Sequence, residues 1–135
     1  MAPLAILETA VYAADLAAAE AFYGGLLGLP VIARVAGRHV FFRVGEGVLL
    51  VFNPEATEVP SANPALPVPV HGARGAGHVC FAASREEIAV WRERFAAAGV
   101  AVEVEFDWPN GARSLYLRDP AGNSVEFAEP RLWEA

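Results

Sequence analysis

Residues 78–99 read HVCFAASREEIAVWRERFAAAG. The apolar run from His78 to Ala83 favours a strand. Ser84 and Glu87 then form an S-x-x-E capping box, which satisfies free N–H groups at the start of a helix. The apolar residues that follow recur at helical spacing, and Gly99 can end the helix in a left-handed conformation. The stretch therefore predicts a strand followed by a helix.

An earlier stretch, residues 8–28, has the same plan and reads ETAVYAADLAAAEAFYGGLLG. The apolar run Leu4–Tyr12 predicts a strand. Asp15 is placed to cap a helix, Gly28 to end it, and Pro30 to prevent its continuation. The strand and helix of the second half thus repeat those of the first, and an internal repeat constrains the fold strongly.

Each strand and helix is followed by three short predicted strands. In the first half these are Val31–Val35, His39–Val44 and Val48–Asn53; in the second half they are Val100–Phe106, Arg113–Arg118 and Asn123–Ala128. A connector rich in proline and glycine lies between the halves. We therefore predict an α+β fold of two βαβββ modules in a single domain, 1–135. Module 1 covers about 4–54, the linker about 55–77 and module 2 about 78–130.

One such module leaves the open face of its sheet exposed to water. Two modules must therefore pair, within one chain or between two chains, and the paired sheets are expected to enclose a cleft that suits a small ligand.

Alternation along the strands predicts which side chains face this cleft. When the halves are aligned, Glu8 matches His78 and Leu50 matches Glu126. Glu8, His78 and Glu126 are then candidate metal ligands, since an imidazole and two carboxylates suit Mn, Fe, Co, Ni or Zn. Three ligands leave positions open for substrate, and Glu8 or Glu126 can shuttle a proton. The alternative is a hydrogen-bonded structural histidine and solvated glutamates.

Other residues are candidates for substrate binding. Phe41 and Tyr116 can stack on a substrate, Trp108 can cover the cleft, and Arg113 can hold an anionic group through paired N–H groups. The alternatives are ordinary packing for the aromatic residues and a surface position for the arginine.

Three further residues are expected to be structural. We expect Cys80 to be a small buried thiol rather than a nucleophile, because no group that would lower its pKa is evident. His71 is expected to be exposed in the linker, and Asp119 to cap its turn.

Composition excludes several classes of function. Of the residues, 55% are hydrophobic and 19% charged, which is typical of a globular protein, and the net charge of −6 argues against a nucleic-acid partner. The single cysteine excludes an internal disulfide framework, and no apolar run is long enough to span a membrane. No signal peptide is apparent, so we expect a cytoplasmic protein without a membrane partner.

Two motifs carry a family resemblance. Residues 6–16, ILETAVYAADL, are followed by Phe22-Tyr23 and Leu27-Gly28, and residues 116–126 read YLRDPAGNSVE. Together with Gly77–Phe81 they resemble the vicinal oxygen chelate superfamily of glyoxalases, bleomycin-resistance proteins and extradiol dioxygenases, over nearly the whole chain. The resemblance implies the glyoxalase/bleomycin-resistance/dihydroxybiphenyl-dioxygenase fold and a homodimer.

The resemblance also implies a ligand set. The family's metal ligands correspond to Glu8, Leu50, His78 and Glu126, and Leu50 cannot bind a metal. The chain is therefore more similar to the three-ligand branch, which includes fosfomycin-resistance and extradiol-dioxygenase proteins. Glu8 stands where His or Gln is more usual, which weakens the dioxygenase interpretation.

Two functions follow from this resemblance. The first is a metal-dependent enzyme that acts on a small oxygen-chelating substrate by lyase, isomerase, thiol-transfer or dioxygenase chemistry. The second is a metal-free, small-molecule binding protein like the bleomycin-resistance proteins.

Overall fold

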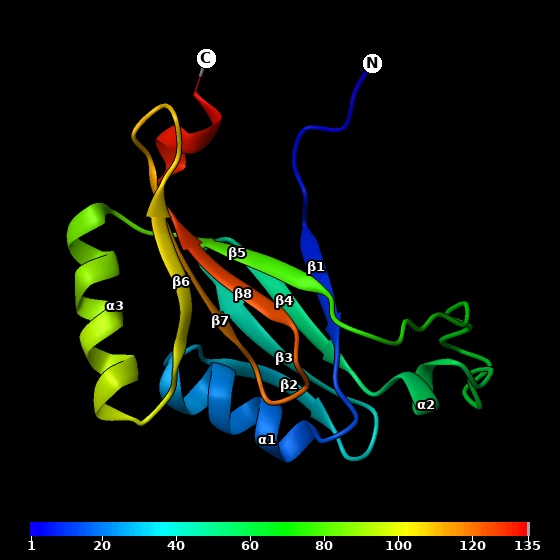
Figure 1. Cartoon of the computed structure of the whole chain (residues 1–135). Helices are drawn as coiled ribbons and strands as arrows, with labels where there is room; N and C mark the ends of the chain where they lie inside the picture. Colours follow the sequence, from blue (N-terminus) through cyan, green and yellow to red (C-terminus); the bar gives the residue numbers. More distant parts are fainter. Residues whose placement is uncertain (135) are drawn as a thin grey trace. The chain divides into compact units, whose positions relative to one another are not determined.

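The computed structural model describes residues 1–134 and divides into two compact units (Figure 1). Unit 1 is Met1–Gly75 and unit 2 is Ala76–Ala135. Each unit contains one four-stranded sheet with a helix on one face. The predicted α+β fold of two βαβββ modules is confirmed, whereas their union in a single domain stays a prediction.

Unit 1 contains the first module and the linker. Its elements are β1 (Glu8–Tyr12), α1 (Leu16–Glu20), the π-helical η1 (Ala21–Leu26), β2 (Val31–Val35), β3 (His39–Val44), β4 (Gly47–Phe52) and α2 (Pro54–Thr57). The strand order is β1-β4-β3-β2, with β1 parallel to β4 and the other pairs antiparallel.

Unit 2 repeats this topology. Its elements are β5 (His78–Ala82), α3 (Arg85–Ala97), β6 (Val102–Asp107), β7 (Arg113–Arg118), β8 (Ser124–Ala128) and the short 3₁₀ helix η2 (Pro130–Trp133). The strand order is β5-β8-β7-β6, again with one parallel pair, β5 and β8.

The predicted helix boundaries are confirmed. The Asp15 side chain accepts a hydrogen bond from the backbone N–H of Ala18, and Ser84 accepts one from Glu87. Gly28 and Gly99 follow the helices with φ of 75° and 71°, a conformation that glycine adopts without steric cost. Local side-chain chemistry therefore positions both helices.

Two segments differ from the prediction. The first strand begins at Glu8 rather than Leu4, because its partner β4 begins at Gly47 and offers no backbone groups to residues before Glu8. No helix was predicted between the halves, but the short helix α2 starts at Pro54, and Asn53 caps it by accepting the N–H of Glu55. Among residues 1–134, no helix is long and apolar enough to cross a membrane.

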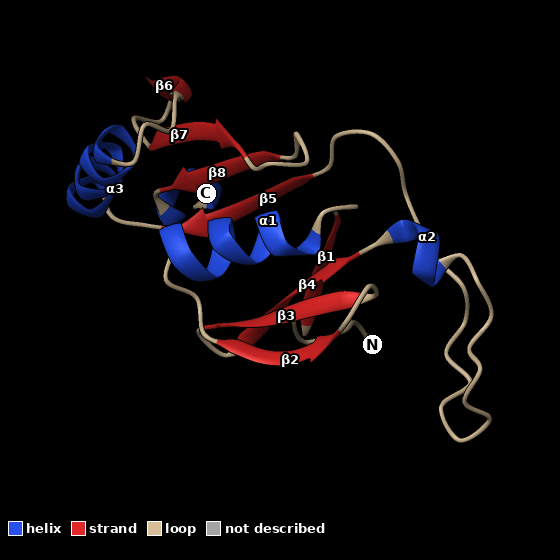
Figure 2. Cartoon of the chain, turned by 90° about the horizontal axis from the view of Figure 1, so that it is seen from below, coloured by secondary structure: helices blue, strands red, loops and turns tan. Residues whose placement is uncertain are grey.

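Each sheet packs one face on its helix and leaves the other without a helix (Figure 2). In unit 1, buried residues on the helix side include Val11, Val40, Phe42, Leu49 and Val51. In unit 2 they include Val79, Leu115, Leu117, Val125 and Phe127. Because successive side chains alternate between faces, the remaining residues of the same strands form an open face in each unit. The predicted site residues, apart from Arg113 and the loop residue Trp108, lie on these open faces.

Candidate functional site

The strand register of unit 2 brings polar side chains together on its open face. Residues paired across a ladder share a face, so the pairing of β5, β8 and β7 forms three rows of neighbours. The rows are His78–Ser124–Arg118, Cys80–Glu126–Tyr116 and Ala82–Ala128–Ser114. Two of the three predicted metal ligands therefore lie on neighbouring strands.

Glu126 is at the centre of this polar cluster. Only 5% of its surface is exposed, although it lies between Val125 and Phe127 in the strand. Its Oε1 lies 3.2 Å from Nε2 of His78, and its Oε2 accepts a 2.6 Å hydrogen bond from the Ser114 hydroxyl. A buried carboxylate needs such partners to offset its lost hydration.

A relay of two hydrogen bonds fixes the role of each Glu126 oxygen. The Trp108 indole N–H donates to Ser114 Oγ at 2.8 Å, and an indole can only donate. Ser114 therefore accepts from Trp108 and gives its own proton to Glu126 Oε2. Oε2 thus accepts a hydrogen bond from Ser114, and Oε1 is the oxygen that lies next to His78 Nε2.

The backbone fixes the His78 ring in a similar way. His78 Nδ1 lies 3.1 Å from the carbonyl oxygen of Ser124. A carbonyl can only accept, so Nδ1 carries a proton, and in the neutral ring Nε2 is left with a lone pair. Nε2 lies 3.2 Å from Glu126 Oε1, and two atoms with lone pairs attract at this distance only when a proton or a metal ion lies between them.

These two donors fit a divalent metal ion. An imidazole nitrogen and a carboxylate oxygen that each bind one ion at about 2.0–2.2 Å are separated by roughly 3 Å. The observed 3.2 Å agrees with that separation, and the Ser124 carbonyl is the kind of partner that orients a metal-bound imidazole. Across residues 1–134, however, no group of three or more His, Cys, Asp or Glu side chains is placed to hold a metal. Glu8 belongs to unit 1, so its part in the site stays a prediction.

Two neutral hydrogen-bond donors flank Glu126. Burial, with the neighbouring Glu126 carboxylate, raises the pKa of Tyr116 to about 12, and the same causes raise the pKa of Cys80 to about 12. Both groups are therefore protonated at neutral pH, and the expectation that Cys80 is not a nucleophile agrees with its raised pKa. The expectation that Cys80 is a buried residue is wrong: the residue is exposed on the open side of the edge strand β5, although its thiol is partly desolvated beside Glu126.

Aromatic rings line the same face. The rings of Tyr116 and Phe106 are parallel within 4°, and their centres are 5.9 Å apart. The centres of the Phe106 and Trp108 rings are 4.8 Å apart. Tyr116 also stacks on His78, with 6.2 Å between the ring centres. Tyr116 and Trp108 thus lie beside the predicted ligands, whereas their role in substrate binding stays a prediction.

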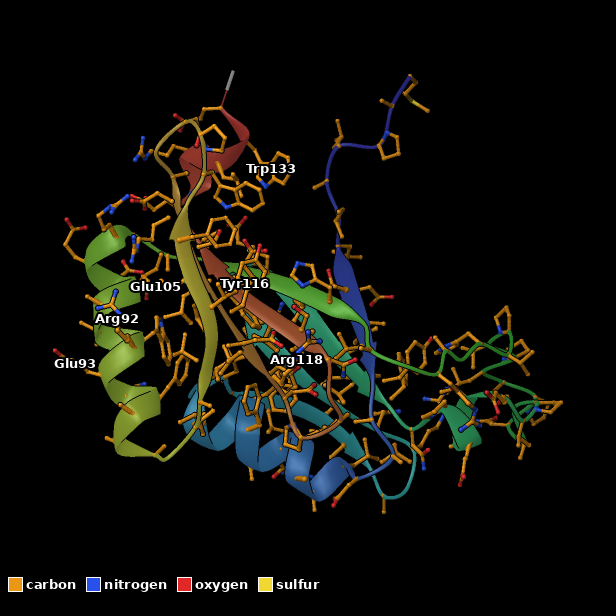
Figure 3. All side chains as sticks on the ribbon, in the orientation of Figure 1. Arg92, Glu93, Glu105, Tyr116, Arg118 and Trp133 are labelled. Atoms are coloured by element: carbon orange, nitrogen blue, oxygen red, sulfur yellow. The ribbon has the colours of Figure 1, made fainter. Side chains whose placement is uncertain are left out.

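Arg113 is not brought to this cluster. Alternation along β7 places it with Leu115 on the α3 side, where its guanidinium binds Glu105 at 2.5 Å and Asp107 at 3.1 Å. Figure 3 shows Glu105 with Arg92 on the α3 side of β6, away from Tyr116. A substrate anion would have to compete with two carboxylates for Arg113.

The open face of unit 1 has the same rows with different chemistry. Leu50, 8% exposed, takes the place of Glu126 and pairs with Ala10 and Phe41. Glu8 is exposed and pairs with Val48. Phe41 stacks on His39 at 3.9 Å. The predicted correspondence of Glu8 with His78 and of Leu50 with Glu126 is confirmed by the strand register of each unit.

Two smaller expectations have different outcomes. Asp119 caps its turn as expected, because its carboxylate accepts the N–H groups of Ala121 and Asn123. His71 was expected to be exposed but is half-buried, with Nδ1 2.7 Å from the Tyr12 hydroxyl and its ring against Phe52.

Two residues beside the candidate site, Ser114 and Phe106, were not among the predicted site residues. Alternation along the strand places Ser114 on the face of Tyr116, but it gives no sign of the hydrogen bonds that Ser114 makes with Trp108 and Glu126. Phe106 could not be placed by alternation, because the ladder between β6 and β7 shifts register between Val102 and Val104.

The profile of the Glyoxalase/Bleomycin resistance protein/Dioxygenase superfamily matches residues 5–127. The chain belongs to this superfamily. A search of curated proteins found no match. Among solved structures, this glyoxalase-family chain is similar to a protein described as lactoylglutathione lyase from Agrobacterium tumefaciens, with 48% identity, 98% of each chain covered and a TM-score of 0.93.

Two more distant structures share the fold alone. One is a glyoxalase/bleomycin resistance protein/dioxygenase from Nocardioides, with 23% identity, 96% of this chain and 85% of that chain covered, and a TM-score of 0.72. The other is an integron cassette protein from the metagenome of a sewage outfall in Halifax Harbour, with 21% identity, 94% of this chain and 99% of that chain covered, and a TM-score of 0.73.

Proposed function

We propose that this glyoxalase-family protein is a divalent-metal-dependent enzyme. His78 Nε2 and Glu126 Oε1 supply two ligands, and Glu8 supplies the third. The observation that carries the proposal is the 3.2 Å approach of these two atoms, because the hydrogen bond at His78 Nδ1 leaves Nε2 with a lone pair beside a carboxylate oxygen. The bound ion, which we assign to the series Zn, Ni, Mn, Fe and Co, would supply Lewis acidity toward substrate oxygens.

The substrate class we propose is a small molecule with oxygens on adjacent carbons. The similar protein from Agrobacterium tumefaciens is described as a lactoylglutathione lyase. Lactoylglutathione is a thioester of a 2-hydroxy acid, so its hydroxyl and carbonyl oxygens are neighbours. Lyase chemistry on such a thioester is therefore our first assignment, ahead of isomerase, thiol-transfer and dioxygenase chemistry.

The residues of this chain fit the proton transfers that such chemistry needs. Cleaving the thioester to an oxoaldehyde and a thiol moves a proton from one carbon to its neighbour and delivers another to sulfur. Glu126 Oε1 can hold one proton, and Glu8 is the second candidate. Tyr116 and Cys80 act as neutral donors, since their pKa values of about 12 keep them protonated. Phe106, Tyr116 and Trp108 form a wall against which a small organic substrate can pack.

We also propose that the protein works as a cytoplasmic homodimer whose partner is a small molecule. Family membership supports the dimer, and the net charge of −6 disfavours nucleic acid and anionic lipid surfaces.

Metal content tests the proposal. Protein purified without added metal is analysed by mass spectrometry, alongside His78→Ala and Glu126→Gln. The matched controls are His71→Ala and Glu103→Gln, which remove the same residue types elsewhere. We expect one divalent ion per wild-type and control chain and loss of the ion in both site variants, with lactoylglutathione cleavage lost in parallel.

A second function is favoured by one observation. Leu50 is buried at the position that corresponds to Glu126, beside the aromatic side chains of unit 1, which suits a metal-free binding protein of the bleomycin-resistance type. Wild-type protein that holds no metal, and that binds none when Zn, Ni, Mn, Fe or Co is titrated, would decide for this alternative and against the enzyme.

A further inference from the structure

The open face of unit 1 carries a second cluster of polar and aromatic side chains, none of which belongs to the cluster around Glu126. We name it the arginine–aromatic cluster; its members are Tyr12, Arg38, His39, Phe41, Phe52 and His71. Strand pairing sets its core, because Tyr12 and His39 both pair with Phe52, from opposite sides of β4.

The rings of the cluster pack on one another. The Phe52 ring is almost perpendicular to the rings of Phe41 and His39, with 5.3 Å and 5.8 Å between the ring centres. The centres of the Phe52 and His71 rings are 4.6 Å apart. His39 and Phe41 stack within 9° of parallel. Phe41, Tyr12 and His71 are only half-buried, so parts of these rings are accessible to a ligand.

Arg38 is a cation without an anion. Its guanidinium lies 5.5 Å from the centre of the Phe52 ring and is half-buried. Seven other arginines form ion pairs, but no described carboxylate pairs with Arg38. One of its five N–H groups donates to His39 Nδ1 at 2.6 Å, which leaves a planar donor fork available.

His39 adds a further donor. Because a guanidinium can only donate, His39 Nδ1 accepts, and the ring proton lies on Nε2. Burial and then the Arg38 charge lower the pKa of His39, which keeps the ring neutral. Among residues 1–134, no fully buried side-chain nitrogen or oxygen lacks a hydrogen-bond partner, so the unused N–H groups of Arg38 and His39 are open to solvent.

We propose that the arginine–aromatic cluster is a binding site for a small planar organic carboxylate. The carboxylate accepts paired hydrogen bonds from Arg38 and one from the His39 Nε2–H, while the planar body packs on Phe41 and the neighbouring rings. The charge argues for an anion, and the rings argue for an unsaturated or aromatic body. This site does not require the metal of the proposed enzyme.

Benzoate is the probe, and binding is followed on the full chain by NMR in a buffer that contains a chelator. We expect a Kd of the order of millimolar and shifts of the His39 and His71 ring signals. Benzyl alcohol, which has the ring without the charge, and acetate, which has the charge without the ring, should each bind roughly tenfold more weakly.

Matched variants locate the site. Arg38→Gln should weaken benzoate binding about tenfold or more, whereas Arg43→Gln, another arginine without an ion pair on the same face, should change it less than about twofold. Arg38→Lys keeps the positive charge but loses the paired N–H groups of the guanidinium, so it should bind benzoate more weakly than wild type. If Arg38→Gln fails to fold, Arg38→Lys shows whether Arg38 binds the carboxylate.

Equal weakening by both arginine variants, equally tight binding of benzyl alcohol, or shifts confined to unit 2 would overturn the proposal. His78→Ala should bind benzoate like wild type. A failure of the metal proposal is therefore distinguishable from a failure of this one.

Discussion

Unit 1 and unit 2 have the same strand order and register but opposite chemistry on their open faces. In unit 2 the middle row is Cys80–Glu126–Tyr116, whereas unit 1 has Ala10–Leu50–Phe41. In the next row unit 2 has Ala82–Ala128–Ser114, and unit 1 has the larger Tyr12–Phe52–His39. The shared backbone fixes where side chains meet, and a few substitutions decide whether they form a polar cluster or an aromatic surface.

Small residues are part of the polar site. Ala82 and Ala128 leave space beside Ser114, which Trp108 reaches with its indole N–H. In unit 1, Phe52 fills the position of Ala128 and packs on both neighbouring strands. The comparison therefore teaches that the buried carboxylate depends on its neighbours as much as on its own position.

The largest effect is expected from making unit 2 resemble unit 1. Glu126→Leu removes the carboxylate that we propose as a metal ligand, so catalytic turnover should fall by about 10²–10⁴-fold. Steady-state kinetics with lactoylglutathione measures it, and Glu103→Gln is the control. Turnover within threefold of wild type would show that Glu126 is structural.

The reverse exchange should be costly for folding. Leu50→Glu places a carboxylate against the rings of unit 1, where the carboxylate of Glu8, rather than an imidazole, stands at the position that corresponds to His78. We expect a loss of about 2–3 kcal/mol in the free energy of unfolding, measured by urea titration. Leu50→Met, of similar volume, serves as control, and equal stability of the two variants would contradict the contrast between the units.

Removing the relay should have an intermediate effect. Ser114→Ala takes one donor from Glu126 and leaves the Trp108 N–H without its acceptor. Metal affinity should fall about 10–100-fold, as for other residues that orient ligands. Ser124→Ala is a matched control, because it keeps the backbone carbonyl that holds His78. Competition with a chromogenic chelator measures both affinities, and an equal change in the two variants would argue against the relay.

The smallest effect concerns Cys80. Its raised pKa of about 12 means that the thiolate fraction at pH 8 is lower in the folded protein than in the unfolded chain. Alkylation by iodoacetamide should therefore be slow and rise with pH toward 12. Glu126→Gln removes the nearby negative charge, lowers the pKa of Cys80 and should speed alkylation roughly tenfold. An unchanged rate would show that Glu126 does not control the thiol.

The sequence alone predicted the fold and part of the site for identifiable reasons. Asp15, Ser84 and the two glycines act through local contacts, so both helices could be located. The proximity of His78 and Glu126 could be inferred because the first and last strands of each repeated module pair in parallel, which fixes their register. The start of β1 could not be predicted from the sequence, since it depends on where the distant strand β4 begins.

Other features depended on contacts that spacing does not encode. The Trp108 indole reaches Ser114 through a turn closed by Gly111, whose φ of 84° bends the chain back. Arg113 was expected near the substrate, but its partners Glu105 and Asp107 lie on the neighbouring strand β6. Phe106 was hidden by the irregular register of that same strand.

The central claim is that a divalent ion, rather than a proton, lies between His78 Nε2 and Glu126 Oε1. A crystal structure with anomalous data at a metal absorption edge tests it most directly. We predict a single anomalous peak about 2.0–2.2 Å from both atoms. Electron density with no anomalous peak, and the two atoms still in hydrogen-bond contact in crystals soaked with metal, would contradict it.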